Sequence, residues 1–214
     1  MSKTDLNILF IGDSITYGEF INRGRTFPQL LDVSLNKSLA VNVNISALAR
    51  NGWTTRDALT SPDWSTAMRF KPEIAVIQFG LNDANRWVTD NGVQRVNIFS
   101  YKHNLIEMIM RLRAAGTEKI FLMNIHKTKK SEQFNVETFA YNLWLEGVAR
   151  REKVGLIDVR DRLITEIDLL PDGIHLNRSG HNLYKMVIQL ALGNAVKSQD
   201  EPDWIKEFND WQNS

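Results

Sequence analysis

The sequence predicts an α/β fold built on a parallel β-sheet. Short apolar runs of strand length alternate along the chain with longer segments of helical periodicity. The apolar runs contain few polar interruptions, which is typical of strands that helices cover on both faces. Alternation at this spacing indicates βαβ units with right-handed crossovers. At 214 residues, the chain is long enough to bury a core without disulfides or a structural metal.

Five apolar runs are expected to form the strands. In chain order they cover residues 6–11, 41–47, 74–79, 119–125 and 154–159. Each run has the length of an ordinary buried strand and is bounded by polar or turn-forming residues.

Four helical patterns accompany these runs, and each begins at a residue suited to capping. Thr26 and Gln29 have the spacing of a capping box. Ser100 and Asn177 are expected to cap two further helices, and Gly116 is expected to end the first of these. The pattern that starts at Ser131 places on its apolar face Val136, Phe139, Leu143 and Val148.

Composition and charge exclude several classes of protein. The chain has 43% hydrophobic and 24% charged residues, so wholesale disorder is excluded. Its net charge of +1, from 26 basic and 25 acidic residues, argues against a nucleic-acid partner. Without cysteine, the chain has no thiol nucleophile, disulfide or Cys-ligated metal. No apolar run has the length of a membrane span or signal sequence, so we expect a cytoplasmic protein with no membrane partner.

One domain is expected over residues 1–198, because no repeat, low-complexity tract or linker divides them. Residues 199–214 are predicted to form an amphipathic helix, with Trp204, Phe208 and Trp211 at helical spacing. The simpler interpretation is that this helix packs on the surface of the domain. The alternative is that its apolar face binds a partner, for example a second copy of the chain.

Residues suited to catalysis or ligand binding follow four of the five expected strands. In an open parallel sheet, ligands bind beyond the carboxyl ends of the strands. Ser14 follows the first strand and Gly52 the second, Asn82 follows the third, and the fifth is followed by Asp172 and His175. We therefore expect these side chains to meet at one edge of the sheet.

Ser14 and His175 are the candidates for nucleophile and general base. A serine between a strand and a helix is often only an N-cap, but free N–H groups and the helix dipole at that place also stabilise developing negative charge. Asp172 favours catalysis, because a histidine that activates a serine needs a carboxylate on its other ring nitrogen. The alternative for residues 172–173 is a plain β-turn. His181 lies within the next helix pattern and is expected on a surface face.

Asn82 and Gly52 are candidates for an oxyanion hole. Asn82 is either a turn residue or an amide that donates to a developing oxyanion. The backbone N–H of Gly52 and that of Ser14 would complete a set of three donors.

These residues lie in four short blocks that resemble those of the SGNH hydrolases, also called GDSL-type esterases and lipases. The blocks read GDSIT at 12–16, NG at 51–52, GLND at 80–83 and DGIHL at 172–176. They occur in the family's order and span most of the chain. The first block departs from the commonest pattern, because Ile15 occupies the position where leucine is more usual.

The resemblance implies a three-layer α/β/α flavodoxin-like fold with a five-stranded parallel sheet. It implies Ser14 as nucleophile, His175 as base and Asp172 as the acid that orients the base. It also implies the oxyanion hole of Ser14, Gly52 and Asn82, and no metal or organic cofactor.

The substrate is expected to be a small-molecule ester, and we favour short-acyl, acetyl-type esters of a small polar or carbohydrate-like compound. The long polar segment 84–99 offers a polar and aromatic wall near the expected site. The candidate substrate contacts are Asp13, Tyr17, Trp53, Asp83, Asn85, Arg86, Trp87 and Ile174. The basic run Lys127–Lys130 is either a solvated loop or a site for an anionic substrate group.

Three alternatives remain open at the level of the sequence. The same site could serve an acyltransferase, or a lysophospholipase or thioesterase. A non-catalytic, flavodoxin-like binding module could hold a phosphate at the helix that begins at Ser14. The Asp172–His175 pair argues against the binding module, because a phosphate cradle has no need of it.

Overall fold

Five parallel strands form the sheet around which the molecule is arranged. The computed structural model describes residues 5–22, 24–39, 41–86, 91–160 and 169–193. The strands are β1 (Asp5–Gly12), β2 (Asn42–Ala49), β3 (Ile74–Gln78), β4 (Lys119–Met123) and β5 (Gly155–Ile157). Their order across the sheet is β2-β1-β3-β4-β5, and every neighbouring pair is parallel. The predicted α/β fold is confirmed, and the ends of each expected strand lie within two residues of the observed ends.

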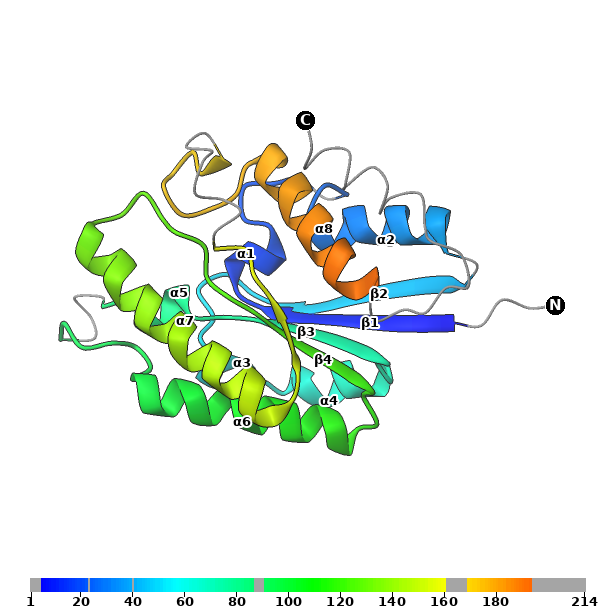
Figure 1. Cartoon of the computed structure of the whole chain (residues 1–214), viewed down its shortest axis with the longest axis horizontal. Helices are drawn as coiled ribbons and strands as arrows, with labels where there is room; N and C mark the ends of the chain where they lie inside the picture. The colour runs from blue at the N-terminus through cyan, green and yellow to red at the C-terminus, as the bar shows by residue number, and fades with distance from the viewer. Residues whose placement is uncertain (1–4, 23, 40, 87–90, 161–168, 194–214) are drawn as a thin grey trace.

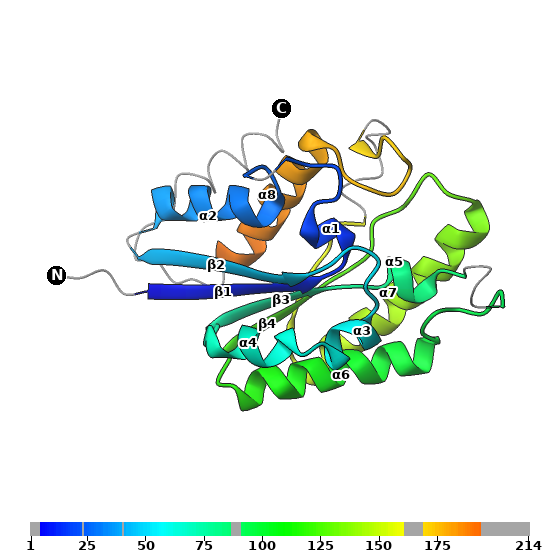
Figure 2. The ribbon, with the colours of Figure 1, turned by 180° about the vertical axis from the view of Figure 1, so that it is seen from behind.

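Helices cover both faces of the sheet. They are α1 (Ser14–Tyr17), α2 (Phe27–Ser38), α3 (Thr55–Thr60), α4 (Asp63–Arg69), α5 (Leu81–Ala84), α6 (Ile98–Ala114), α7 (Glu132–Glu152) and α8 (Arg178–Gly193). Figures 1 and 2 show α2 and α8 on one face, and α3, α4, α6 and α7 on the other. The result is the three-layer α/β/α arrangement. Both views place the short helices α1 and α5 together at the carboxyl end of the strands.

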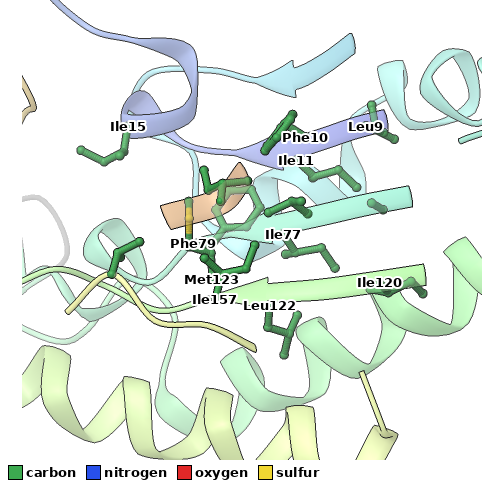
Figure 3. Close-up of a cluster of buried hydrophobic side chains, with 14 of the residues drawn as sticks. Leu9, Phe10, Ile11, Ile15, Ile77, Phe79, Ile120, Leu122, Met123 and Ile157 are labelled. Atoms are coloured by element: carbon green, nitrogen blue, oxygen red, sulfur yellow. The ribbon is translucent and has the colours of Figure 1, made fainter. Parts of the chain in front are cut away.

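The core lies on both sides of β1 and β3. Ile8–Ile11 and Ala75–Ile77 have no exposed surface, and Ile11 pairs with Ile77 in the register of the two strands. Figure 3 shows Ile11 of β1 and Ile77 of β3 in one cluster with Leu122 and Met123 of β4. Burying one such aliphatic side chain contributes roughly 1.5–3 kcal/mol. Strands buried on both faces need apolar residues at successive positions, which explains the uninterrupted apolar runs of the sequence.

Three of the four expected helix starts are confirmed. Thr26 and Gln29 form the capping box of α2, the Ser131 hydroxyl accepts from the backbone at the start of α7, and Asn177 caps α8. The expectation for Ser100 is wrong. Helix α6 begins three residues earlier, where the side chain of Asn97 accepts hydrogen bonds from two backbone N–H groups.

The expected buried face of α7 is also wrong, apart from Val148. Exposed side chains occupy the positions Val136, Phe139 and Leu143. The helix instead turns polar residues inward, because it packs on the main chain of the loop after β4. Asn142 accepts from the Ile125 N–H at 2.7 Å and donates to the Ile125 carbonyl at 2.9 Å. Buried backbone groups require such partners, so polarity on this face is a packing requirement.

Some expectations fall outside the described residues. Trp204, Phe208 and Trp211 lie there, so the division at residue 198 and the terminal helix remain predictions. Among the helices that the structure describes, none is both long enough and apolar enough to cross a membrane.

We predict that Asn142→Leu lowers the free energy of unfolding by about 2–6 kcal/mol. The variant leaves the N–H and carbonyl of Ile125 buried without their partner, and each such loss costs about 1–3 kcal/mol. Chemical denaturation of the purified protein measures the change. Leu143→Ala, at the adjacent and exposed position of the same helix, is the control and should shift stability by less than about 1 kcal/mol. Equal effects of the two variants would contradict this account of the α7 interface.

Candidate active site

Ser14 lies at the first position of α1, directly beyond the carboxyl end of β1. The N-cap of this helix is Asp13, whose carboxylate accepts from the Ile15 N–H at 2.9 Å. Capping therefore does not occupy the Ser14 hydroxyl. The side chain of Ser14 is largely buried and lines a large cavity at the strand ends.

A chain of hydrogen bonds joins three side chains from the two ends of the sequence. Ser14 Oγ lies 2.9 Å from His175 Nε2, and His175 Nδ1 lies 2.6 Å from Asp172 Oδ2. A carboxylate can only accept, so Nδ1 carries the proton and the neutral ring presents Nε2 to the serine as an acceptor. The arrangement can remove a proton from the Ser14 hydroxyl.

Asp172 is held in place by its own turn. Its Oδ1 accepts from the N–H groups of Ile174, at 2.9 Å, and of His175, at 2.7 Å. Partial burial acts to raise the pKa of Asp172, but hydrogen bonds from the His175 ring and from these two N–H groups outweigh it. The pKa is lowered to about 2. Asp172 is therefore ionised throughout the physiological range and faces His175 as a fixed negative charge.

Two backbone N–H groups and one side-chain amide border the same cavity. Within the described part of the chain, the N–H groups of Ser14 and Gly52 have no hydrogen-bond acceptor. Asn82 donates one amide hydrogen to the Trp53 carbonyl at 3.0 Å, which leaves the second for a ligand. Gly52 has φ +72°, a conformation that favours glycine. This set of donors can bind a negatively charged oxygen.

Close packing at Gly80 fixes the start of α5, which carries Asn82. Gly80 has φ +132°, and a Cβ there would lie 2.3 Å from the Ile125 side chain. Tyr101 donates its hydroxyl hydrogen to the adjacent Phe79 carbonyl at 3.0 Å. No other residue type fits this position without moving the buried neighbours.

Asp13 and Asp83, two of the candidate substrate contacts, are fully buried, and the structure contradicts that role. Asp83 instead accepts from the Thr55 N–H at 3.0 Å and from the Thr55 hydroxyl, which ties α5 to the start of α3. The turn that contains Gly52 directly precedes α3. Asp83 thus links the two segments that carry the candidate oxyanion donors.

Burial also shifts the protonation of these two carboxyls. Burial raises the pKa of Asp13 from 3.8 to about 7, against the hydrogen bond from Ile15, and the nearby charge of Asp83 adds to the rise. Burial likewise raises the pKa of Asp83 to about 7, against the hydrogen bonds from Thr55. Within the described residues, Asp13 Oδ2 has no hydrogen-bond partner. Burial thus favours the neutral form of both carboxyls.

The cavity has a volume of about 880 Å³. Its walls come from several elements: Ser14, Glu19, Phe20, Asn51, Gly52, Asn82, Asn85, Arg86, Lys130, Ser131, Gln133, Phe134, Glu137, Ile174 and His175. Of the predicted substrate contacts, Asn85, Arg86 and Ile174 are among them. Arg86 is paired with Glu137 of α7 at 3.2 Å. The basic run contributes Lys130 to the wall.

Tyr17 and Trp53 do not line this cavity. Tyr17 borders a separate depression beside α2, and Trp53 borders another that is formed with α3 and the residues after it. The Trp53 ring instead packs against the Arg50 guanidinium, 5.2 Å from the ring centroid. Trp87 lies outside the described residues.

Several wall residues carried no recognisable signal in the sequence. Phe20 has φ +64°, a strained conformation for an aromatic residue, and its ring meets the His175 ring edge-on at 5.4 Å. Phe134 and Glu137 project from the first turns of α7, far along the chain from Ser14. Phe20 follows the first block within six residues, but nothing local marks it as a wall.

The surface position expected for His181 is wrong. Its side chain is buried, stacks on the Phe27 ring and accepts at Nδ1 from the Phe27 N–H at 3.2 Å. Burial lowers the pKa of His181 to about 4. It stabilises the start of α2 in its neutral form.

Among the residues that the structure describes, no group of three or more His, Asp or Glu side chains is placed to hold a metal ion.

Comparison with known proteins matches this chain to one family. Residues 10–183 match the model of the GDSL-like Lipase/Acylhydrolase family. An uncharacterized protein of Mycoplasma pneumoniae is 32% identical over 153 residues, which cover 69% of this chain. The matched stretch spans only 17% of that much longer relative.

Solved structures of hydrolases share the fold. Axe2, an acetylxylan esterase from Geobacillus stearothermophilus, is similar with a TM-score of 0.76 and 18% identity, over 89% of this chain and 95% of that one. LAE5, an α/β hydrolase from the metagenome of Lake Arreo, is similar with a TM-score of 0.77 and 21% identity, over 92% and 99% of the two chains.

We predict that replacing the buried Asp13 with Asn changes how stability depends on pH. The folded protein keeps the Asp13 proton up to pH 7 or so, whereas the unfolded chain loses it near pH 4. Between these values, rising pH therefore destabilises the wild type by about 1.4 kcal/mol per pH unit relative to Asp13→Asn, with no further change above them. Urea denaturation across this range measures the difference. Asp5→Asn, at the exposed start of β1, is the control, and a pH-independent difference for Asp13→Asn would refute the prediction.

Proposed function

Because the chain belongs to the GDSL-like lipase/acylhydrolase family, we propose that it is a serine esterase that cleaves short-acyl esters through an acyl-enzyme on Ser14. The observation that carries the proposal is the unbroken hydrogen-bond chain from Asp172 through His175 to Ser14. The cavity gives an ester access to that hydroxyl and to the three candidate donors.

In the first step, Ser14 Oγ attacks the ester carbonyl carbon while His175 Nε2 takes the hydroxyl proton. The ring becomes an imidazolium, which the negative charge of Asp172 stabilises. Nε2 then gives the proton to the ester oxygen, the bond from carbonyl carbon to that oxygen breaks, and the alcohol leaves. The acyl group remains on Ser14.

The negative charge on the carbonyl oxygen requires donors that are already in place. The N–H groups of Ser14 and Gly52 and the free amide hydrogen of Asn82 border the cavity at this point. Removing one such donor typically raises the barrier by about 3–4 kcal/mol. The Trp53 carbonyl keeps the Asn82 amide oriented before the ester binds, so little reorganisation accompanies the reaction.

In the second step, a water molecule enters the place that the alcohol has left and hydrolyses the acyl-enzyme. His175 takes a proton from the water, the hydroxide attacks the acyl carbon, and Nε2 returns the proton to Ser14 Oγ as the acid product forms.

The walls of the cavity favour a small polar alcohol, such as a sugar, as the group that carries the acyl chain. Polar side chains with both signs of charge, Glu19, Lys130 and the Arg86–Glu137 pair, can bind hydroxyl groups. The exposed ring of Phe20 offers an apolar surface beside His175. The similarity in fold to an acetylxylan esterase supports the same substrate class.

The proposal predicts that Ser14 alone reacts with an organophosphate serine probe. Its hydroxyl is activated by His175, whereas Ser131 lines the same cavity and only caps α7. Mass spectrometry of the labelled protein locates the adduct. Ser14→Ala should also lower turnover of a chromogenic acetate by about 10³-fold or more. Labelling of Ser131, or turnover that survives Ser14→Ala, would reject the proposed nucleophile.

A series of model esters from acetyl to dodecanoyl tests the preference for short acyl chains. We predict that kcat/KM is highest for the acetate and decreases along the series, because most of the residues that line the cavity carry polar groups. An apolar channel would add up to about 0.8 kcal/mol per buried methylene and raise kcat/KM instead. A rise toward dodecanoyl would favour a lipase or lysophospholipase. Acetylated monosaccharides then distinguish sugar esters from other acetates.

A further inference from the structure

The segment that carries the proposed base is a short turn with little packing of its own. Pro171 and Asp172 are exposed, while Ile174 and His175 are only partly buried. Backbone hydrogen bonds join Gly173 to Leu170 and to the Lys129 N–H. Catalysis requires the His175 ring to keep Nδ1 on Asp172 and Nε2 on Ser14. The backbone at His175 must therefore be held in one orientation.

The side chain of His126 contacts this turn from the interior of the protein. His126 lies in the loop between β4 and α7, its side chain is almost fully buried, and it does not line the cavity. His126 Nε2 lies 2.8 Å from the Ile174 carbonyl, and His126 Nδ1 lies 2.6 Å from the hydroxyl of Tyr184 on α8. The imidazole therefore bridges α8 and the turn.

The chemistry of the two partners determines the tautomer of this imidazole. A carbonyl oxygen only accepts, so Nε2 carries the hydrogen. The Tyr184 hydroxyl then donates to the bare Nδ1. Burial lowers the pKa of His126 to about 4, so the ring is uncharged at neutral pH. The neutral ring gives its only hydrogen to the Ile174 carbonyl.

The peptide that joins Ile174 to His175 is consequently held at both ends. Its carbonyl accepts from His126, and its N–H donates to Asp172 Oδ1 at 2.7 Å. The plane of this peptide sets the direction of the bond from the His175 Cα to its side chain. A rotation of the plane would move the ring away from Ser14 or from Asp172.

We propose that His126 is a positioning residue for the active site, which acts by clamping the Ile174–His175 peptide so that the His175 ring bridges Asp172 and Ser14. The role rests on the proposed function of His175 as general base. His126 touches neither the substrate nor the reacting atoms. His126 instead determines how often the His175 ring is aligned for proton transfer.

The test compares His126→Leu with His181→Leu. Both histidines are buried to the same degree, but His181 contacts the start of α2 and makes no hydrogen bond to the catalytic turn. We expect His126→Leu to lower kcat by about 10- to 100-fold per folded molecule, with KM changed by less than about twofold, because small misplacements of catalytic groups cost this much. His181→Leu should leave kcat within about twofold. His126→Gln, which keeps a donor for the Ile174 carbonyl, should recover most of the loss.

A measurement on the ring itself separates this proposal from the proposed esterase activity. The His175 Nδ1 hydrogen, held 2.6 Å from Asp172, should give a downfield proton resonance in the wild type and in His181→Leu. It should broaden or disappear in His126→Leu. If the wild type cleaves no ester, the function is wrong, and the resonance still tests the clamp. Equal kcat in the two leucine variants, or an unchanged resonance in His126→Leu, overturns the proposal.

Tyr184→Phe decides the matter if His126→Leu does not fold. The variant keeps both rings and removes only the hydroxyl that donates to His126 Nδ1 and so holds the imidazole in place against the turn. Lower kcat at unchanged KM, together with a broadened His175 resonance, supports the clamp. Wild-type values of both refute it.

Discussion

The hydrogen bond between Ser14 Oγ and His175 Nε2 joins residues 161 positions apart in the chain. It forms only if β1 and the turn before α8 arrive at the same edge of the sheet, in the correct register and orientation. The parallel sheet satisfies the first condition, because the carboxyl ends of all its strands point the same way. Buried polar contacts around the loops satisfy the second. The proposed chemistry therefore depends on the whole sheet being assembled.

Those loops are held by side chains that the core would normally exclude. Asn142 binds both main-chain groups of Ile125, Asp83 binds the first turn of α3, and His126 binds the Ile174 carbonyl. Each of these polar side chains is buried, and each binds a backbone group that has no partner within a strand or helix. A buried polar group is costly unless paired, so these contacts specify one loop conformation.

The sequence predicted the parts of the structure whose signals are local or periodic. Strands covered on both faces require continuous apolar runs, and three helix starts had the correct capping residues. The strand-end rule also put Ser14, Asn82 and His175 at one edge, where the structure places them. The short helices α3, α4 and α5 lacked periodicity. The inward face of α7 was mistaken because its polar residues pack on a loop. His181 was mistaken because its place in a helix pattern does not show which face of that helix is buried. Cavity walls such as Phe20 and Phe134 meet only in three dimensions.

The length of α1 has a consequence for how an oxyanion is stabilised. With four residues, α1 completes little more than one turn, so few peptide dipoles are aligned behind Ser14. The long-range field of a helix is therefore weak here, and a bound anion depends on individual N–H groups at contact distance. Such hydrogen bonds depend strongly on direction, and small displacements weaken them. Selectivity for a tetrahedral intermediate over a planar ester would then come from geometry, which salt screens far less than it screens a diffuse field.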